Sequence, residues 1–182
     1  MLLISRFCAV LEAVVRSTVI LGALLFPALI IVCVYEVVAR YVFNASTIWA
    51  FDVTFMLHGA LFMLTGAYGL QKKVHVRIDL LSELLPVRMQ HAMYAVIFPA
   101  LFIPSIWILS DAAVYRTWSA YNTNEVELAS AWGPLVWPIY GAVALGLIAL
   151  LLQSTVETIR HITGIFTGAA LVPAEHDPDR GV

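Results

Sequence analysis

The chain has 182 residues, of which 62% are hydrophobic and only 12% are charged, and its formal net charge is -2. A mean hydropathy of +0.90 does not suit a soluble domain of this length, so the composition predicts an integral membrane protein. The sequence has no basic tract that would suggest a nucleic-acid partner. Its two cysteines, Cys8 and Cys33, lack CxxC spacing and indicate neither a disulfide framework nor a redox pair.

The first 16 residues carry apolar side chains on one predicted helical face and Ser5, Arg6, Glu12 and Arg16 on the other. This pattern predicts an interfacial amphipathic helix over residues 1–16. Behind it come four apolar stretches close to the length of about 20 residues that a spanning helix needs, at 17–35, 53–71, 89–110 and about 134–155. Pro99 and Pro104 predict bends inside the third stretch.

These elements predict an all-α integral membrane protein with four transmembrane helices. The four-helix domain covers residues 17–160, and residues 161–182 form a tail whose end, "VPAEHDPDRGV", has the composition of a disordered segment. The connection between the second and third helices is rich in basic residues, whereas the first and third connections have one arginine each: Lys72, Lys73, Arg77 and Arg88 against Arg40 and Arg116. By the positive-inside rule, both termini and the middle connection are cytoplasmic.

Few ionisable residues lie near the predicted hydrocarbon region, and each has a structural explanation beside a functional one. His58 lies well inside the second predicted span, whereas His91 stands at the start of the third, beside the basic middle connection. Ionisable groups in membranes are functional candidates by default, but a neutral imidazole also satisfies itself by hydrogen bonding to a neighbouring helix. Glu36 and Arg40 are spaced for an ion pair, and Asp52 begins the second helix, so helix-end anchoring or a contact with a partner helix explains them.

His75 and Asp79 are spaced to share a face of the middle connection, whether it is helical or extended. A zinc site there would need a further ligand, which only Glu83 and His91 could offer. The sequence contains no GxGxxG, GxxxxGK[ST], HExxH or GxSxG pattern, so nucleotide-binding and hydrolase functions lack their usual residues. It also lacks paired Gly/Pro-broken helices in two matching halves, which argues against a self-sufficient transporter.

Two segments in order, "RYVFNASTIWAFD" and "LTGAYGLQKKVHVRIDLL", carry a family resemblance. The chain resembles the DctQ-type small permease subunit of tripartite ATP-independent periplasmic (TRAP) transporters. The resemblance covers residues 36–160 and is weaker in "WGPLVWPIYGAVALGLIALLLQSTVETIR". The matching residues are Arg40, Tyr41, Phe43, Asn44, Trp49, Asp52, Gly66, His75, Arg77, Asp79 and Leu80.

The resemblance implies a non-catalytic subunit without a cofactor in the bacterial inner membrane. Its partners would be a large multi-span permease, which holds the sodium and substrate sites, the lipid bilayer, and a periplasmic substrate-binding protein that delivers an organic acid or related carboxylate. The chain itself would serve as a scaffold, and the matching residues would fix loop geometry or subunit contacts. The alternative from the four-helix count and His58 is a haem or quinone membrane anchor of an oxidoreductase.

Overall fold

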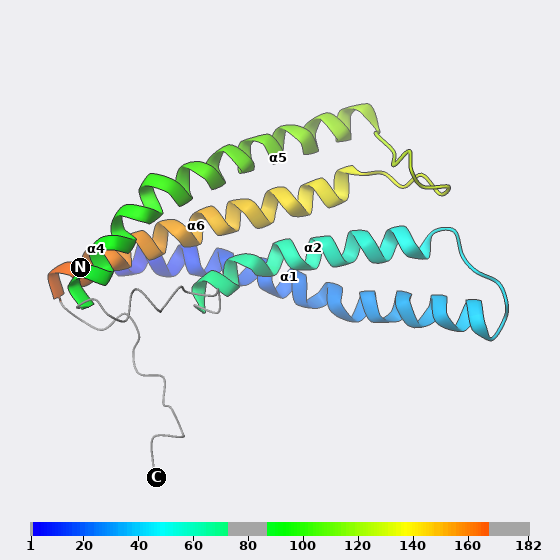
Figure 1. Cartoon of the computed structure of the whole chain (residues 1–182), viewed down its shortest axis with the longest axis horizontal. Coiled ribbons are helices and arrows are strands. Elements are labelled where there is room, and N and C mark those ends of the chain that lie inside the picture. The colour runs from blue at the N-terminus through cyan, green and yellow to red at the C-terminus, as the bar shows by residue number, and fades with distance from the viewer. Residues whose placement is uncertain (1, 73–86, 168–182) are drawn as a thin grey trace, which may run out of the picture.

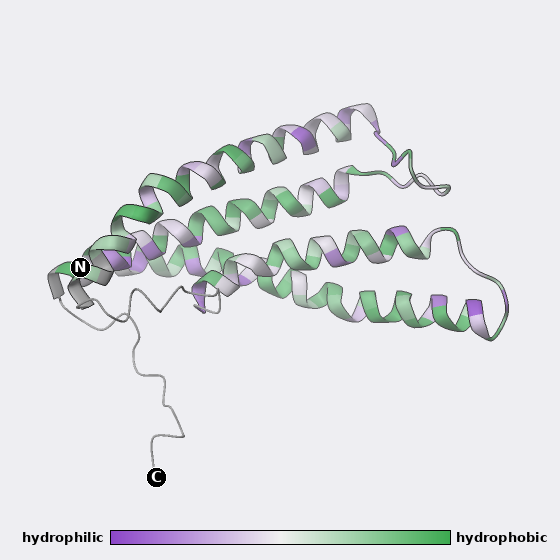
Figure 2. Ribbon diagram, in the orientation of Figure 1, coloured by the Kyte–Doolittle hydropathy of each residue, from purple (hydrophilic) through white to green (hydrophobic). Residues whose placement is uncertain are grey.

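The computed structural model describes residues 2–72 and 87–167, and the elements in these ranges are helices. They are α1 (Leu2–Tyr41), α2 (Ala50–Gln71), α4 (Val87–Ile97), the π-helical turn η1 (Phe98–Phe102), α5 (Ile103–Thr123) and α6 (Trp137–Thr167), as Figure 1 shows. Within these two ranges, four helical stretches are long and apolar enough to cross a membrane: Arg6–Tyr41, Ala50–Gln71, Ala92–Thr123 and Trp137–Ile165. The prediction of an all-helical chain with four candidate spans is confirmed, and Figure 2 shows that hydrophobic residues predominate along these helices.

The helices form a layer in the order α1, α2, α6, α5 (Figure 1). α1 packs on α2, α2 packs on α6, and α5 packs on α6. α6 also contacts α4 and α1. It therefore touches each of the other α-helices, and they are arranged around it. Because the helices lie side by side in one layer, each keeps a broad apolar face that no other helix covers. Many large hydrophobic side chains are exposed as a result.

α1 is one continuous helix of 40 residues, with no boundary near residue 16. The sequence from Leu2 to Leu21 contains neither glycine nor proline, so nothing in it interrupts the helix. At 1.5 Å per residue the helix is about 60 Å long, roughly twice the thickness of a bilayer core. Part of α1 must therefore extend beyond the hydrocarbon, while the placement of residues 1–16 at the membrane surface stays a prediction.

The third span departs from regular α-helix where the sequence predicts a bend. η1 contains Pro99, which has no amide hydrogen to donate, and the wider π-helical turn accommodates it. The helix then continues to Thr123, so residues 111–123 are helical, although the predicted third span ended at residue 110. Asn124 ends α5 in the left-handed conformation, with φ of 48°, which asparagine tolerates better than most residues.

Small residues bring the helices close together. An ideal Cβ added at Gly146 of α6 would lie 2.4 Å from the carbonyl oxygen of Met63 on α2. One added at Gly22 of α1 would lie 2.9 Å from Cγ2 of Thr65 on α2. A core of Val15, Ala67 and Ala149 joins the same three helices. Small residues at helix contacts are typical of membrane proteins, where association depends on close packing.

Candidate functional site

At one end of the layer, the Glu36 carboxylate fastens the connection between α1 and α2. Its Oε1 accepts hydrogen bonds from Arg40 Nε at 3.1 Å and Arg40 Nη2 at 2.6 Å. Its Oε2 accepts hydrogen bonds from the Thr47 amide at 3.2 Å and from the Thr47 hydroxyl. The Thr47 Oγ1 in turn accepts a bond from the Ala50 amide at the start of α2. We call Glu36, Arg40 and Thr47 the Glu36 clasp.

Replacing Glu36 by alanine is expected to lower the free energy of unfolding by about 1–2 kcal/mol, because the Thr47 amide and hydroxyl lose their acceptor. Thermal unfolding in detergent measures the change, and limited proteolysis should show faster cleavage between α1 and α2. Arg40→Ala is the control. It removes only a half-exposed i,i+4 pair and should cost about 0.5 kcal/mol or less. Equal losses from the two variants would contradict the role given to Thr47.

The other matched residues of this connection shape its path. Asn44 has a left-handed backbone, with φ of 52°, which reverses the chain direction after α1. Trp49 stacks on Tyr35 with ring centroids 5.6 Å apart, so it ties the start of α2 to α1. Tyr41 is exposed at the end of α1. Arg40, Asn44 and Trp49 thus all lie in or beside the connection between α1 and α2, and Tyr41 lines a surface hollow there with Glu36 and Arg40.

Asp52 connects α2 to the segment between α5 and α6. The Ser130 hydroxyl donates a hydrogen bond to Asp52 Oδ2, and Ser130 Oγ accepts one from the Trp132 amide at 3.0 Å. The first turn of α2 is therefore joined through one carboxylate to the connection between α5 and α6. Asp52 was predicted to act at the end of a helix, and the structure shows that its hydrogen-bond partner is Ser130, 78 positions away in sequence.

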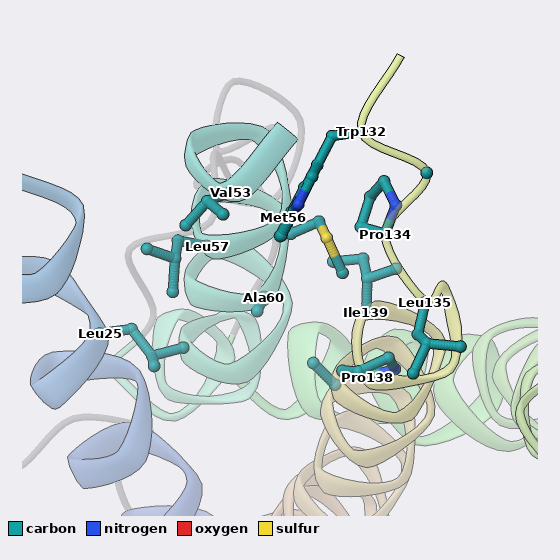
Figure 3. A pocket seen from close by; sticks show the side chains of 12 residues that line it. Leu25, Val53, Met56, Leu57, Ala60, Trp132, Pro134, Leu135, Pro138 and Ile139 are labelled. Carbon is teal, nitrogen blue, oxygen red and sulfur yellow. The ribbon is translucent and has the colours of Figure 1, made fainter. Parts of the chain in front are cut away.

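An apolar groove of about 680 Å³ lies beside this link (Figure 3). It is lined by residues of α1, α2, the segment before α6 and the start of α6: Leu25, Val53, Met56, Leu57, Ala60, Trp132, Gly133, Pro134, Leu135, Pro138, Ile139 and Ala142. All of these side chains are uncharged. The groove suits hydrocarbon or apolar side chains and offers a carboxylate no cationic partner.

A second polar group, which we call the α6 polar cluster, lies near the other end of the layer. Its members are buried residues of α6: Gln153, Ser154, Glu157, Thr158 and His161. Glu157 Oε1 accepts hydrogen bonds from Gln153 Nε2 at 3.2 Å and from Arg160 Nη1 at 3.1 Å. Arg160 Nη2 also donates to Glu12 of α1, so the cluster joins α6 to α1.

His161 belongs to the same cluster and contacts α4 and η1. Its ring centroid lies 4.9 Å from that of Tyr94 and 5.8 Å from that of Phe98. Sequence reasoning placed His161 at the start of the tail and missed its burial. The available signal was the spacing of Gln153, Glu157 and His161 at i, i+4 and i+8, which places three polar residues on one helical face.

Comparison with known proteins decides the family. The family model for the DctQ component of tripartite ATP-independent periplasmic transporters matches residues 29–164, well over half of the chain. The chain belongs to the DctQ family. It is also similar to the C4-dicarboxylate TRAP transporter small permease protein DctQ of Vibrio cholerae, with 25% identity over 101 residues. That alignment spans 51% of this chain and 42% of the relative.

The matched range of this DctQ chain includes the Glu36 clasp, the Asp52–Ser130 link and the α6 polar cluster, whereas Glu12 lies before it. Gly66, another matched residue, has open space beside it: an ideal Cβ there meets no atom of residues 2–72 or 87–167 within 4 Å. His75, Arg77 and Asp79 lie outside the described residues, so the expected meeting of His75 and Asp79 stays a prediction. Within the described part of the chain, no group of three or more His, Cys, Asp or Glu residues could hold a metal ion.

Proposed function

We propose that this DctQ chain is the non-catalytic small permease subunit of a sodium-driven, binding-protein-dependent TRAP transporter for organic acids or related carboxylates. In this proposal it scaffolds the large permease subunit, and a periplasmic substrate-binding protein delivers the substrate. The membership of the DctQ family carries the proposal. The V. cholerae relative is named as a C4-dicarboxylate transporter component, which supports a carboxylate substrate.

The distribution of polar groups supports a scaffold. Glu36, Asp52 and Glu157 each bond to groups that fix helix ends or helix pairs. The groove beside Asp52 is apolar, so these carboxylates do not converge on a cavity that would recognise a carboxylate. The open layer also leaves large hydrophobic side chains exposed on its helices, as expected of a chain that is covered by lipid and by another membrane subunit.

The proposal includes an inner-membrane location with both termini in the cytoplasm. The basic residues between α2 and α4 support this orientation by the positive-inside rule. The N-terminal part of α1 would then run along or near the cytoplasmic surface as an amphipathic segment. His75, Arg77 and Asp79 would lie on the same side, where we propose that they fix loop geometry or contact the large subunit.

The alternative of a haem or quinone anchor has little support among the described residues. His58 is exposed on α2, whereas His161 is buried on α6 beside the rings of Tyr94 and Phe98. Two axial histidines that hold a haem must face each other across it. His58 and His161 do not face each other, so they do not form such a pair.

Affinity purification tests the proposed function directly. A tagged chain, coexpressed with its cognate large permease, is expected to yield a stable complex, and deletion of the chain is expected to abolish sodium-dependent uptake. A tagged four-helix membrane protein of another family serves as the control for non-specific recovery. Recovery of this chain alone, together with unchanged uptake after its deletion, would exclude the scaffold function.

A further inference from the structure

The outward face of α2 carries a row of aromatic residues with one histidine among them. Phe51, Phe55, His58 and Phe62 follow one another at i, i+4, i+7 and i+11, a spacing that places them on one side of a helix. The three phenylalanines are 78%, 71% and 66% exposed, and His58 is exposed as well. The buried residues Ala60, Leu64 and Ala67 occupy the opposite side, toward the rest of the layer.

His58 is the residue on this face that lipid alone does not explain. It lies within the candidate span Ala50–Gln71, about 12 Å along the helix from its first residue. No hydrogen bond among the described residues involves the His58 side chain, which is exposed on the side of α2 opposite its buried residues. A polar group that faces hydrocarbon without a partner is costly, so intramembrane histidines bond to a neighbouring chain or line a wet site.

Gly66 adds an independent observation at the edge of the same face. A glycine inside a helix is less favourable than alanine by about 1 kcal/mol, so it usually has a packing reason. Gly22 and Gly146 have such reasons, because side-chain or backbone atoms lie 2.9 Å and 2.4 Å from the ideal Cβ positions. Gly66 has none among the residues that the structure describes, since none of their atoms lies within 4 Å of the ideal Cβ. A second helix approaching from outside would use that space.

We infer that this outward face, formed by Phe51, Phe55, His58, Phe62 and Gly66, docks against a membrane helix of the large permease subunit. The His58 imidazole would hydrogen-bond to a polar side chain or an exposed carbonyl of that helix, and Gly66 would allow close backbone approach. The inference rests on the proposed function, which supplies the partner. Phenylalanines by themselves would suit lipid equally well, but the unpartnered histidine and the open glycine position together favour a protein neighbour.

Site-specific photo-crosslinking tests the location of the interface. The crosslinking amino acid p-benzoylphenylalanine is placed at Phe55 in the chain coexpressed with its cognate large permease, and the membranes are irradiated. The controls replace Ile31 of α1, which is 67% exposed, and Trp107 of α5, which is 64% exposed. Crosslinking to the large subunit is expected to be at least about tenfold stronger from position 55 than from either control.

Two substitutions test the residues that distinguish docking from contact with lipid. His58→Leu and Gly66→Leu are each expected to reduce the amount of copurified large subunit about fivefold, a loss on the scale of one interhelical hydrogen bond or one close contact in a membrane. His58→Gln should retain most of the binding. Thermal unfolding of the isolated chain should be unchanged by His58→Leu, because the side chain has no partner among the described residues.

The outcomes separate this inference from the proposed function. If the unaltered chain copurifies with the large permease but crosslinks mainly from Ile31 or Trp107, the interface lies elsewhere and only the inference fails. The inference also fails if His58→Leu and Gly66→Leu leave copurification unchanged. If the unaltered chain does not copurify at all, the proposed function fails first.

Discussion

Replacing Gly146 by alanine is expected to lower the free energy of unfolding of the isolated chain by about 2 kcal/mol. The added Cβ would lie 2.4 Å from the carbonyl oxygen of Met63 and 2.6 Å from its carbonyl carbon. Both are backbone atoms, so α2 and α6 must move apart rather than repack one flexible side chain, and overpacking of this kind costs about 1–3 kcal/mol. Thermal unfolding in detergent, followed by circular dichroism, measures the loss.

Gly66→Ala is the matched control for this substitution. It adds the same methyl group to the same helix pair, but on the outward face, where no atom of the described part of the chain lies within 4 Å of the ideal Cβ. The isolated chain should therefore be unchanged or stabilised by up to about 1 kcal/mol, because alanine favours the helix. Similar destabilisation by both variants would show that the close contact between Gly146 and Met63 does not hold α2 against α6.

Replacing Arg160 by alanine is expected to destabilise the chain by about 1–3 kcal/mol. Glu157 would lose a cationic partner while its side chain stays 3% exposed, and the connection from Glu12 of α1 to α6 would be lost. Removing one partner of a buried pair typically costs more, but the Arg160 side chain is 44% exposed, so water already screens part of the interaction. The same unfolding measurement applies.

A second substitution identifies the cause of that loss. In the Arg160→Ala background, Glu157→Gln removes the uncompensated carboxylate, keeps a hydrogen-bonding side chain and should restore about half of the lost stability. Glu12→Ala alone should cost less than Arg160→Ala, because Arg160 would still bond to Glu157. If Glu157→Gln fails to restore any stability, the burial of a lone charge is not the reason for the effect of Arg160→Ala.

The number of spans and the helical fold could be predicted from the sequence, because hydropathy over about 20 residues responds directly to the bilayer. The ends of the helices could not. Residues 111–123 were expected in a loop because they are polar and aromatic, yet they contain no glycine or proline, and the helix ends only where Asn124 adopts a left-handed backbone. Likewise, α1 continues past Arg16 because the sequence from Leu2 to Leu21 contains no glycine or proline that would end the helix there.

The candidate sites divide in the same way. The Glu36–Arg40 pair follows from i,i+4 spacing and was predicted, whereas Thr47 and Ser130 come from loops whose paths are fixed only in three dimensions. The α6 polar cluster was missed because its burial depends on α1 and α4 lying against α6. Hydropathy alone treats Glu157 and His161 as residues beyond the end of a span.

The order of the helices in the layer has a consequence for biogenesis. α1 and α2 are neighbours in sequence and in space, and so are α5 and α6, so the chain consists of two helical hairpins in series. Each hairpin can enter the bilayer and pair soon after synthesis, because its contacts are local. Joining the hairpins through α2 and α6 is the remaining long-range event. Gly146 and Met63 lie where α2 and α6 meet. Their close contact therefore forms in the step that joins the two inserted hairpins into the final tertiary structure.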